Sequence, residues 1–104
     1  MSIISITVTT TAGAVYTSAG STAITFMSLC NYSGGNVLAN VYAVPAGNTT
    51  STTNQILASI EIASLDTYQF YAGGEKLLLD NGDTLQVDAS ANAAVTVVTS
   101  YTSI

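Results

Sequence analysis

The feature that most constrains the fold of this chain is a succession of short runs in which apolar and polar residues alternate. In residues 4–9, Ile and Val alternate with Ser and Thr, and the same two-residue period returns over residues 37–44, 56–62 and 95–101. Successive side chains of a β-strand point to opposite faces, so this period predicts half-buried strands. A helix over residues 56–63 is the main alternative, but the two-residue period favours a strand there.

Turn-forming residues separate these runs at intervals of roughly 8–12 residues, a spacing typical of antiparallel sandwiches and barrels. Gly, Asn, Ser and Asp gather in residues 18–21, 31–36, 46–55 and 80–83, of which 46–55 is the longest polar stretch and predicts an exposed loop. We therefore expect an all-β fold, a single antiparallel β-sandwich of jelly-roll or immunoglobulin-like type, spanning residues 1–104 as one domain. The expected strands, about eight or nine in number, cover residues 4–9, 15–17, 23–30, 37–44, 56–62, 68–71, 77–79, 85–87 and 95–101.

The stretch from Glu75 to Val87 carries the strongest local signal in the chain. Two apolar runs, residues 77–79 and 85–87, flank the polar sequence Asp-Asn-Gly-Asp of residues 80–83. Asn-Gly readily takes positive φ in a tight turn, so this arrangement predicts a β-hairpin between the two runs.

The periodicity also predicts the core. Residues 23–30 are apolar on both faces, which is typical of a central strand. The side chains expected in the core are those of Ile24, Phe26, Val41, Ile60, Leu77, Leu79, Leu85, Val87, Val95 and Val97.

The charge balance excludes several kinds of partner. Charged residues make up only 7% of the chain, the formal net charge is −5, and Lys76 is the single cation among the side chains. Nucleic acids and anionic membranes are bound through several cationic contacts, so neither is expected as a partner. The first six residues carry no basic segment, and no apolar run approaches the length of a membrane span, so we expect neither a secretory signal nor an anchor.

The chain also lacks the residue types of common catalytic and metal sites. It contains no His and no Arg, and Cys30 is its one cysteine, so nucleophile–His systems and thiolate–imidazole zinc sites are excluded. We expect no cofactor and no enzymatic activity, and we expect Cys30 to be a buried, inert thiol. Asp80 and Asp83 are best explained by turn positions, where Asp hydrogen-bonds its own backbone. A Ca²⁺ site formed by Asp80, Asn81 and Asp83, with Asp88 as an optional further ligand, is the alternative.

Candidate interface residues are the tyrosines and the single lysine. Tyr offers a large apolar area with a polar tip, which is why it is enriched at protein interfaces. The candidates are Tyr16, Tyr32, Tyr42, Tyr68, Tyr71, Lys76 and Tyr101; for Lys76 the alternative is a solvated pair with Glu75. Asn31 and Asn48 match the glycosylation pattern, but turn roles are favoured for both.

Four segments in their order along the chain carry a resemblance to a known family. They are Leu-Cys-Asn-Tyr-Ser-Gly-Gly at 29–35, Val-Tyr-Ala-Val-Pro-Ala-Gly at 41–47, Asp-Thr-Tyr at 66–68 and Glu-Lys-Leu-Leu-Leu-Asp-Asn-Gly-Asp-Thr-Leu at 75–85. Over residues 22–104 the chain resembles small virion structural proteins of tailed bacteriophages, especially cyanobacterial and other marine phages.

This resemblance implies a non-enzymatic β-sandwich that assembles onto the phage particle in the cytoplasm of the host bacterium. The expected role is a capsid decoration, or cement, protein that binds the major capsid protein or other virion proteins as a homo-oligomer, with a trimer favoured by the three-fold positions of an icosahedral shell. The alternative is a tail, baseplate or fibre-adaptor component that contacts host glycan through residues 46–55.

Overall fold

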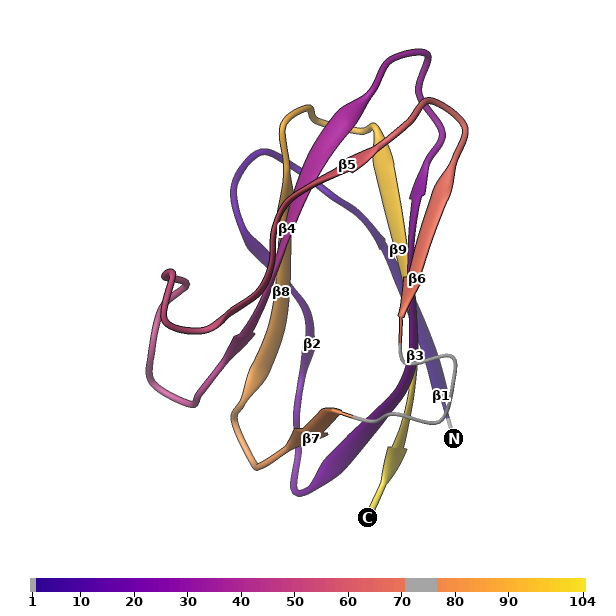
Figure 1. The fold of residues 1–104 in the computed structure, drawn as a ribbon. Helices are drawn as coiled ribbons and strands as arrows, with labels where there is room; N and C mark the ends of the chain where they lie inside the picture. Colours follow the sequence, from indigo (N-terminus) through magenta and orange to yellow (C-terminus); the bar gives the residue numbers. More distant parts are fainter. Residues whose placement is uncertain (1, 71–76) are drawn as a thin grey trace.

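In the part of the chain that the structure describes, nine β-strands form two antiparallel sheets that pack face to face, as the sequence predicts (Figure 1). The structure, a computed structural model, describes residues 2–70 and 77–104. Residues 56–62, for which a helix was the alternative, lie in a strand. The strands are β1 (Ser2–Thr7), β2 (Gly13–Thr17), β3 (Thr22–Asn31), β4 (Val37–Val44), β5 (Gln55–Ile62), β6 (Thr67–Phe70), β7 (Leu77–Leu79), β8 (Thr84–Ala89) and β9 (Val95–Ser103).

The two sheets have different strand orders. Sheet A has the order β1-β9-β3-β6, and β7 pairs with β3 beside β6; sheet B has the order β2-β8-β4-β5. The central position expected for residues 23–30 is confirmed, because β3 pairs with β9 on one side and with β6 and β7 on the other. In Figure 1 the two sheets stand side by side, and the loop between β4 and β5 projects away from sheet B.

The strand pairs are nested around the connection between β4 and β5. β4 pairs with β5, β3 with β6, β2 with β8 and β1 with β9. The chain is therefore one long antiparallel hairpin rolled into two sheets, which is the arrangement of a jelly roll with β7 added beside β6.

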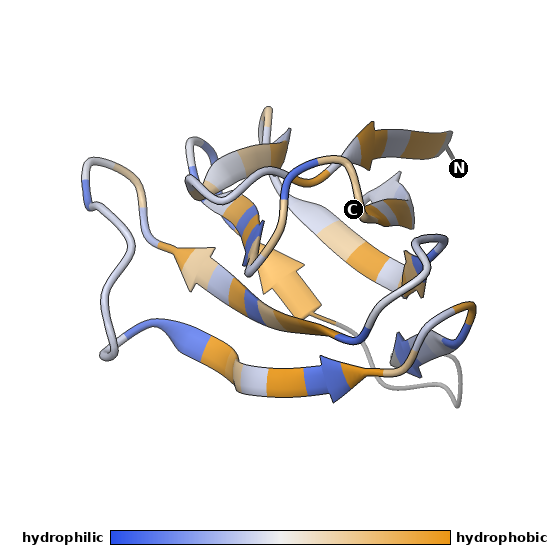
Figure 2. Ribbon diagram, turned by 90° about the horizontal axis from the view of Figure 1, so that it is seen from above, coloured by the Kyte–Doolittle hydropathy of each residue, from blue (hydrophilic) through white to orange (hydrophobic). Residues whose placement is uncertain are grey.

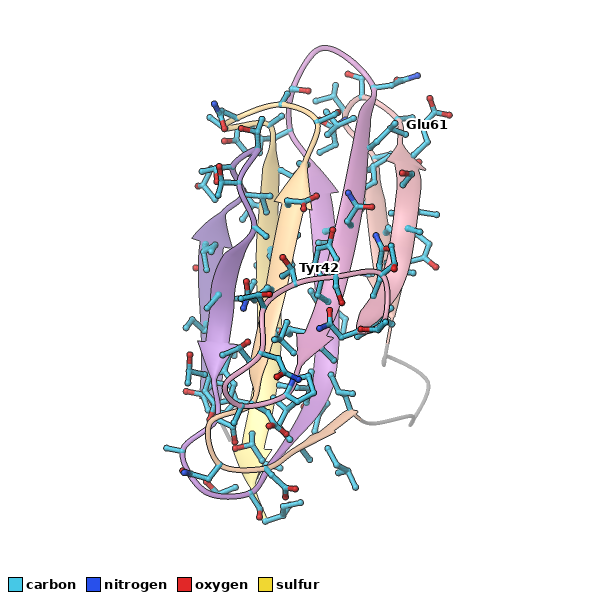
Figure 3. The ribbon with its side chains drawn as sticks, turned by 90° about the vertical axis from the view of Figure 1, so that its left-hand side faces the viewer. Tyr42 and Glu61 are labelled. Atoms are coloured by element: carbon cyan, nitrogen blue, oxygen red, sulfur yellow. The ribbon has the colours of Figure 1, made fainter. Side chains whose placement is uncertain are left out.

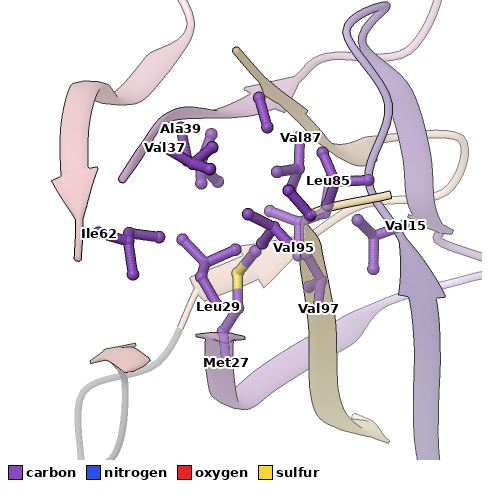
Figure 4. Close-up of a cluster of buried hydrophobic side chains, with 14 residues drawn as sticks. Val15, Met27, Leu29, Val37, Ala39, Ile62, Leu85, Val87, Val95 and Val97 are labelled. Atoms are coloured by element: carbon purple, nitrogen blue, oxygen red, sulfur yellow. The ribbon is translucent and has the colours of Figure 1, made fainter. Parts of the chain in front are cut away.

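One cluster of apolar side chains fills the space between the sheets (Figure 4). Both sheets contribute to it: Met27, Leu29 and Val97 come from sheet A, and Val41 and Leu85 from sheet B, and all five are fully buried. Of the predicted core residues, Ile24, Val41, Leu79, Leu85, Val87, Val95 and Val97 are buried, while Ile60 and Leu77 are half-buried against the cluster.

The predicted hairpin between residues 77–79 and 85–87 is wrong. β7 pairs with β3 in sheet A, whereas β8 pairs with β2 and β4 in sheet B. Residues 80–83 do form a turn, in which the backbone N–H of Asp83 donates to the carbonyl oxygen of Asp80 at 3.1 Å and Gly82 has a φ of 89°. Positive φ at the third position alone is typical of a type II turn, whereas the type I′ turn of a tight hairpin has positive φ at both central positions. Because β7 and β8 lie in different sheets, this turn carries the chain from sheet A to sheet B.

Two irregularities shift side chains from the faces that strict alternation predicts. The register of β3 changes between Ile24 and Phe26, so Ile24 faces the core and Phe26, predicted to be in the core, faces outward and is half-buried. The second lies in β5, where Ser59 has a φ of 51° and the register with β4 shifts twice, between Ala39 and Val41 and between Val41 and Tyr42. A bulge adds one residue to one strand and so reverses the faces beyond it.

Candidate interaction surface

The outer face of sheet A can be followed row by row from the strand register. Ile3 of β1 lies opposite Ser100 of β9, which lies opposite Phe26 of β3. The neighbouring inward row contains Thr99 and Met27, both fully buried, so the row of Ile3 and Phe26 points away from the core. The same alternation gives three further outward rows.

Together these rows form a surface on which none of the described residues carries a charged side chain, and we name it the uncharged face. Its residues are Ile3, Ser100 and Phe26; Thr102 and Leu78, on either side of the buried Ala23; Ser5, Val98, Ser28 and Gln69; and Thr7, Thr96, Cys30 and Thr67. Ser and Thr hydroxyl groups are mixed with apolar side chains across it. Such a surface can pack closely against another protein without the desolvation of ionic groups.

Two large apolar side chains are most exposed on this face. The side chain of Ile3 is 72% exposed and that of Leu78 is 65% exposed. Cys30 lies on the same face and is half-buried, so the prediction of a buried thiol is wrong. Cys30 lies opposite Thr96 and Thr67, on the outer side of β3.

The opposite surface, the outer face of sheet B, has a polar centre at Asn40. The side-chain N–H of Asn40 donates to Asp88 Oδ1 at 2.7 Å, and its Oδ1 accepts from the backbone N–H of Ser59 at 2.7 Å and from Gln55 Nε2 at 2.9 Å. These bonds hold β8, β4 and the irregular part of β5 together. Asn40 therefore stabilises the bulge at Ser59. The alternation of apolar and polar residues does not indicate this role. An amide side chain between Ala39 and Val41 in an otherwise apolar strand could have marked Asn40 as a structural residue.

Tyr42, which is labelled in Figure 3, forms the second half of this polar group with Asp88. The hydroxyl group of Tyr42 donates to Asp88 Oδ2 at 3.3 Å. Partial burial raises the pKa of Tyr42, and the adjacent carboxylate of Asp88 raises it further because it opposes a second negative charge. With Asn40 and Tyr42 both bonded to it, Asp88 is part of the sheet structure.

A second group of hydrogen bonds ties three loops together at the end of the sandwich near β7. Asp83 Oδ1 accepts from the backbone N–H of Ala46 at 2.9 Å, and its Oδ2 accepts from that of Asp80 at 2.9 Å. Asn81 Oδ1 accepts from the backbone N–H of Gly20 at 2.9 Å. The turn prediction for these Asp and Asn residues is confirmed, and each of these bonds uses an oxygen atom that a Ca²⁺ ion would need.

Asp88 lies in the sheet, away from the turn of residues 80–83, so the four residues of the alternative Ca²⁺ site are not brought together. Within residues 2–70 and 77–104 no group of three or more acidic or Cys side chains is arranged to hold a metal ion.

The loop after β4 contains a shallow hollow of about 340 Å³. Its lining is made of small polar residues and glycine: Gly47, Asn48, Thr49, Ser51, Thr53 and Asn54. The loop is braced internally, because Asn54 Nδ2 donates to the carbonyl oxygen of Thr49 at 3.0 Å and the hydroxyl groups of Ser51 and Thr53 lie 2.7 Å apart. The sequence prediction of an exposed loop at residues 46–55 is confirmed.

The predicted interface tyrosines do not gather on one surface. The rings of Tyr16 and Tyr101 stack at 4.2 Å between their centroids and so connect β2 with β9. Tyr68 packs against the core cluster, Tyr42 lies on the outer face of sheet B, and Tyr32 is 46% exposed in the loop after β3.

Two of the other candidates, Tyr71 and Lys76, lie outside the described residues, as does Glu75. The side chain of Asn31 is fully buried, and its Nδ2 donates to the carbonyl oxygens of Gly35 and Ile62 at 2.9 Å each. Asn31 therefore organises the turn of residues 31–36, as predicted, and its amide is enclosed.

The uncharged face was not predicted from the sequence because it is assembled from five strands that lie far apart in the chain. A signal was nevertheless present: the first charged side chain in the sequence is that of Glu61. The described charged residues, Glu61, Asp66, Asp80, Asp83 and Asp88, lie in sheet B or in connecting segments.

Comparisons with protein-family models, curated proteins and solved structures find no match to this chain. Among the described residues, no helix is long and apolar enough to cross a membrane.

Proposed function

We propose that this protein is a non-enzymatic structural component of a bacteriophage particle, a decoration protein that binds the assembled head shell as a homo-oligomer. Its binding partner in this proposal is the major capsid protein or another virion protein. The observation that carries the proposal is the uncharged face, which offers a broad outer sheet surface to a protein neighbour.

The chemistry of this face suits close packing between proteins. Ile3 and Leu78 expose apolar area that is stabilised when water is removed from it. The surrounding Ser and Thr hydroxyl groups can pair with the backbone groups of a partner, so burial does not leave isolated charges. Figure 2 shows how hydrophobic and hydrophilic residues succeed one another along the strands.

The topology supports the same proposal at the level of fold. Jelly rolls are frequent among viral capsid domains and also among lectins. A shared fold does not determine function, so the proposal depends on the surface and on the resemblance of residues 22–104 to phage virion proteins.

Sedimentation with undecorated phage heads tests the proposal. The purified protein is expected to co-sediment with assembled heads and to bind free coat subunits more weakly. Leu78→Lys places a charge on the uncharged face and is expected to weaken co-sedimentation at least tenfold. Leu38→Lys is the matched control, because Leu38 is 43% exposed on the outer face of sheet B. Equal binding by both variants would contradict the use of this face, and no binding by the unchanged protein would contradict the decoration role.

The hollow in the loop after β4 favours a second candidate function, glycan binding by a tail or fibre-adaptor protein. Amide and hydroxyl side chains line it, and these are the groups that hydrogen-bond sugar hydroxyls. Calorimetric titration with host-surface polysaccharide tests this candidate. Binding that Asn48→Ala abolishes would support it, and an absence of heat change would contradict it.

The proposed oligomer can have one of two symmetries on a shell. A trimer, expected from the three-fold positions, and a dimer at two-fold positions both satisfy the decoration role. The free edges of the sheets favour the dimer.

A further inference from the structure

The exposed edges of the two sheets differ in how well they could accept an additional strand. An edge strand presents unpaired backbone N–H and C=O groups, and proteins usually protect such edges with bulges, charges, Pro or short length. Sheet B has two edges of this protected kind. β2 carries a register shift between Ala14 and Tyr16, and β5 carries the shift at Ser59 and the charged side chain of Glu61.

Sheet A has one protected and one unprotected edge. On the side of β3 that faces away from β9, β6 has four residues and β7 has three. On the other side, β1 pairs with β9 over six consecutive residues, Ser2 to Thr7, without a register shift. β1 contains neither Pro nor a charged residue. Among the described edges, β1 is therefore the one that offers a regular, unobstructed template.

We infer that two copies of this chain pair through β1, antiparallel and across a two-fold axis, so that the two copies of sheet A form one continuous sheet. The pairing centres on Ser5, which lies opposite its own copy. Ile4 of one chain then lies opposite Ile6 of the other on the core side, and Ile3 lies opposite Thr7 on the uncharged face. This register matches inward residues with inward residues, which a shift by one residue would not do.

The distribution of charged residues favours a second copy of this chain as the partner that pairs with β1. The formal net charge of the chain is −5, so two copies repel each other unless their acidic groups are kept apart. All strands of sheet A are free of charged residues, and the described acidic side chains lie in sheet B and in connecting segments. Pairing at β1 is therefore a self-complementary contact that brings no like charges together.

This inference deepens the proposed decoration role and rests on it for the biological setting, while the edge can be tested in the purified protein. In a Cys30→Ser background, Ser5→Cys is expected to form a disulfide-linked dimer in high yield under mild oxidation, because cross-strand neighbours lie within the range of a disulfide. Thr7→Cys, two residues further along β1, is expected to link poorly because it lies opposite Ile3. Thr17→Cys, exposed on the β2 edge, is the control for random collision.

Two lysine variants test the same pairing without disulfide cross-linking. Light scattering is expected to give a dimer for the unchanged protein and for Thr17→Lys, and a monomer for Ser5→Lys. Circular dichroism checks that each variant keeps its β-structure. A monomer or a trimer in the unchanged protein would overturn the two-fold pairing, as would equal disulfide yield at Ser5 and Thr17.

Different measurements would contradict the proposed decoration role and the proposed pairing through β1. A dimer that does not co-sediment with heads contradicts the decoration role and leaves the pairing intact. A monomer that does co-sediment contradicts the pairing and leaves the decoration role intact.

Discussion

A Cβ atom added at Gly82 would lie 3.0 Å from the Cβ atom of Ala46, so the turn before β8 lies directly against the loop after β4. Gly82 also has a φ of 89°, which a β-branched residue strongly disfavours. We expect Gly82→Val to lower the free energy of unfolding by about 1–3 kcal/mol, measured by urea denaturation. Gly34→Val is the matched control, because a Cβ atom at Gly34 meets no atom within 4 Å. An equal loss at both positions would contradict the importance of this contact.

The carboxylate of Asp83 provides a second test of the same region. It accepts backbone hydrogen bonds from Ala46 and Asp80, and Asp83→Ala leaves both N–H groups without this acceptor. We expect a loss of about 1–3 kcal/mol in the free energy of unfolding. Asp83→Asn keeps one acceptor oxygen and should fall between the parent and the Ala variant in thermal unfolding. A loss for Asn as large as that for Ala would show that the negative charge, rather than the acceptor geometry, stabilises the loops.

The neighbours Leu78 and Leu79 point to opposite sides of sheet A. Leu79 is 4% exposed and Leu78 is 65% exposed. Truncation of a buried Leu leaves a cavity, so Leu79→Ala should cost about 2–5 kcal/mol of unfolding free energy. Leu78→Ala should change it by less than about 0.5 kcal/mol. Similar losses in the two variants would contradict the assignment of these residues to the core side and the outer side.

The raised pKa of Tyr42 predicts a loss of stability in alkali. Partial burial and the neighbouring carboxylate of Asp88 both favour the protonated phenol in the folded state. Since the pKa is higher in the folded than in the unfolded chain, the stabilisation is complete below the ordinary tyrosine pKa of 10.0 and is lost as the pH rises through the folded pKa. Tyr42→Phe should therefore lose less stability than the parent as the pH rises above 10.0 in chemical denaturation. Parallel pH profiles for the two proteins would contradict this contribution.

Most of the strands were predictable because the alternation of apolar and polar residues is a local pattern, which can be recognised within a few residues of the sequence. Residues 4–7 and the alternating runs at residues 37–44 and 95–101 lie in strands. Val37, Ala39, Val41, Val95 and Val97 are buried on the core side, as expected. Bulges are harder to predict, since one extra residue in β3 or β5 leaves the composition of the run unchanged while it reverses a face. This is why Phe26 faces outward.

Strand pairing was not predictable from local signals. The Asn81-Gly82 pair specifies that the chain turns, and the structure has that turn, but the turn residues do not determine which partner each flanking strand finds. β7 finds β3 and β8 finds β2 and β4, in different sheets. The uncharged face depends on these long-range pairings, so it could be recognised only once the register was known.

The nesting of strand pairs around the β4–β5 connection has a consequence for the order of folding. Pairing of β4 with β5 closes a short loop, whereas pairing of β1 with β9 joins residues from the two ends of the described chain. The entropic cost of loop closure rises with the length of the loop, and each inner pair shortens the loop that the next pair must close. We therefore expect slow folding that spreads outward from β4 and β5, with β1 docking last. In that order, the edge strand proposed to join two copies becomes available only when the rest of each sandwich has formed, so association would follow folding and partly folded chains would be kept from pairing at β1.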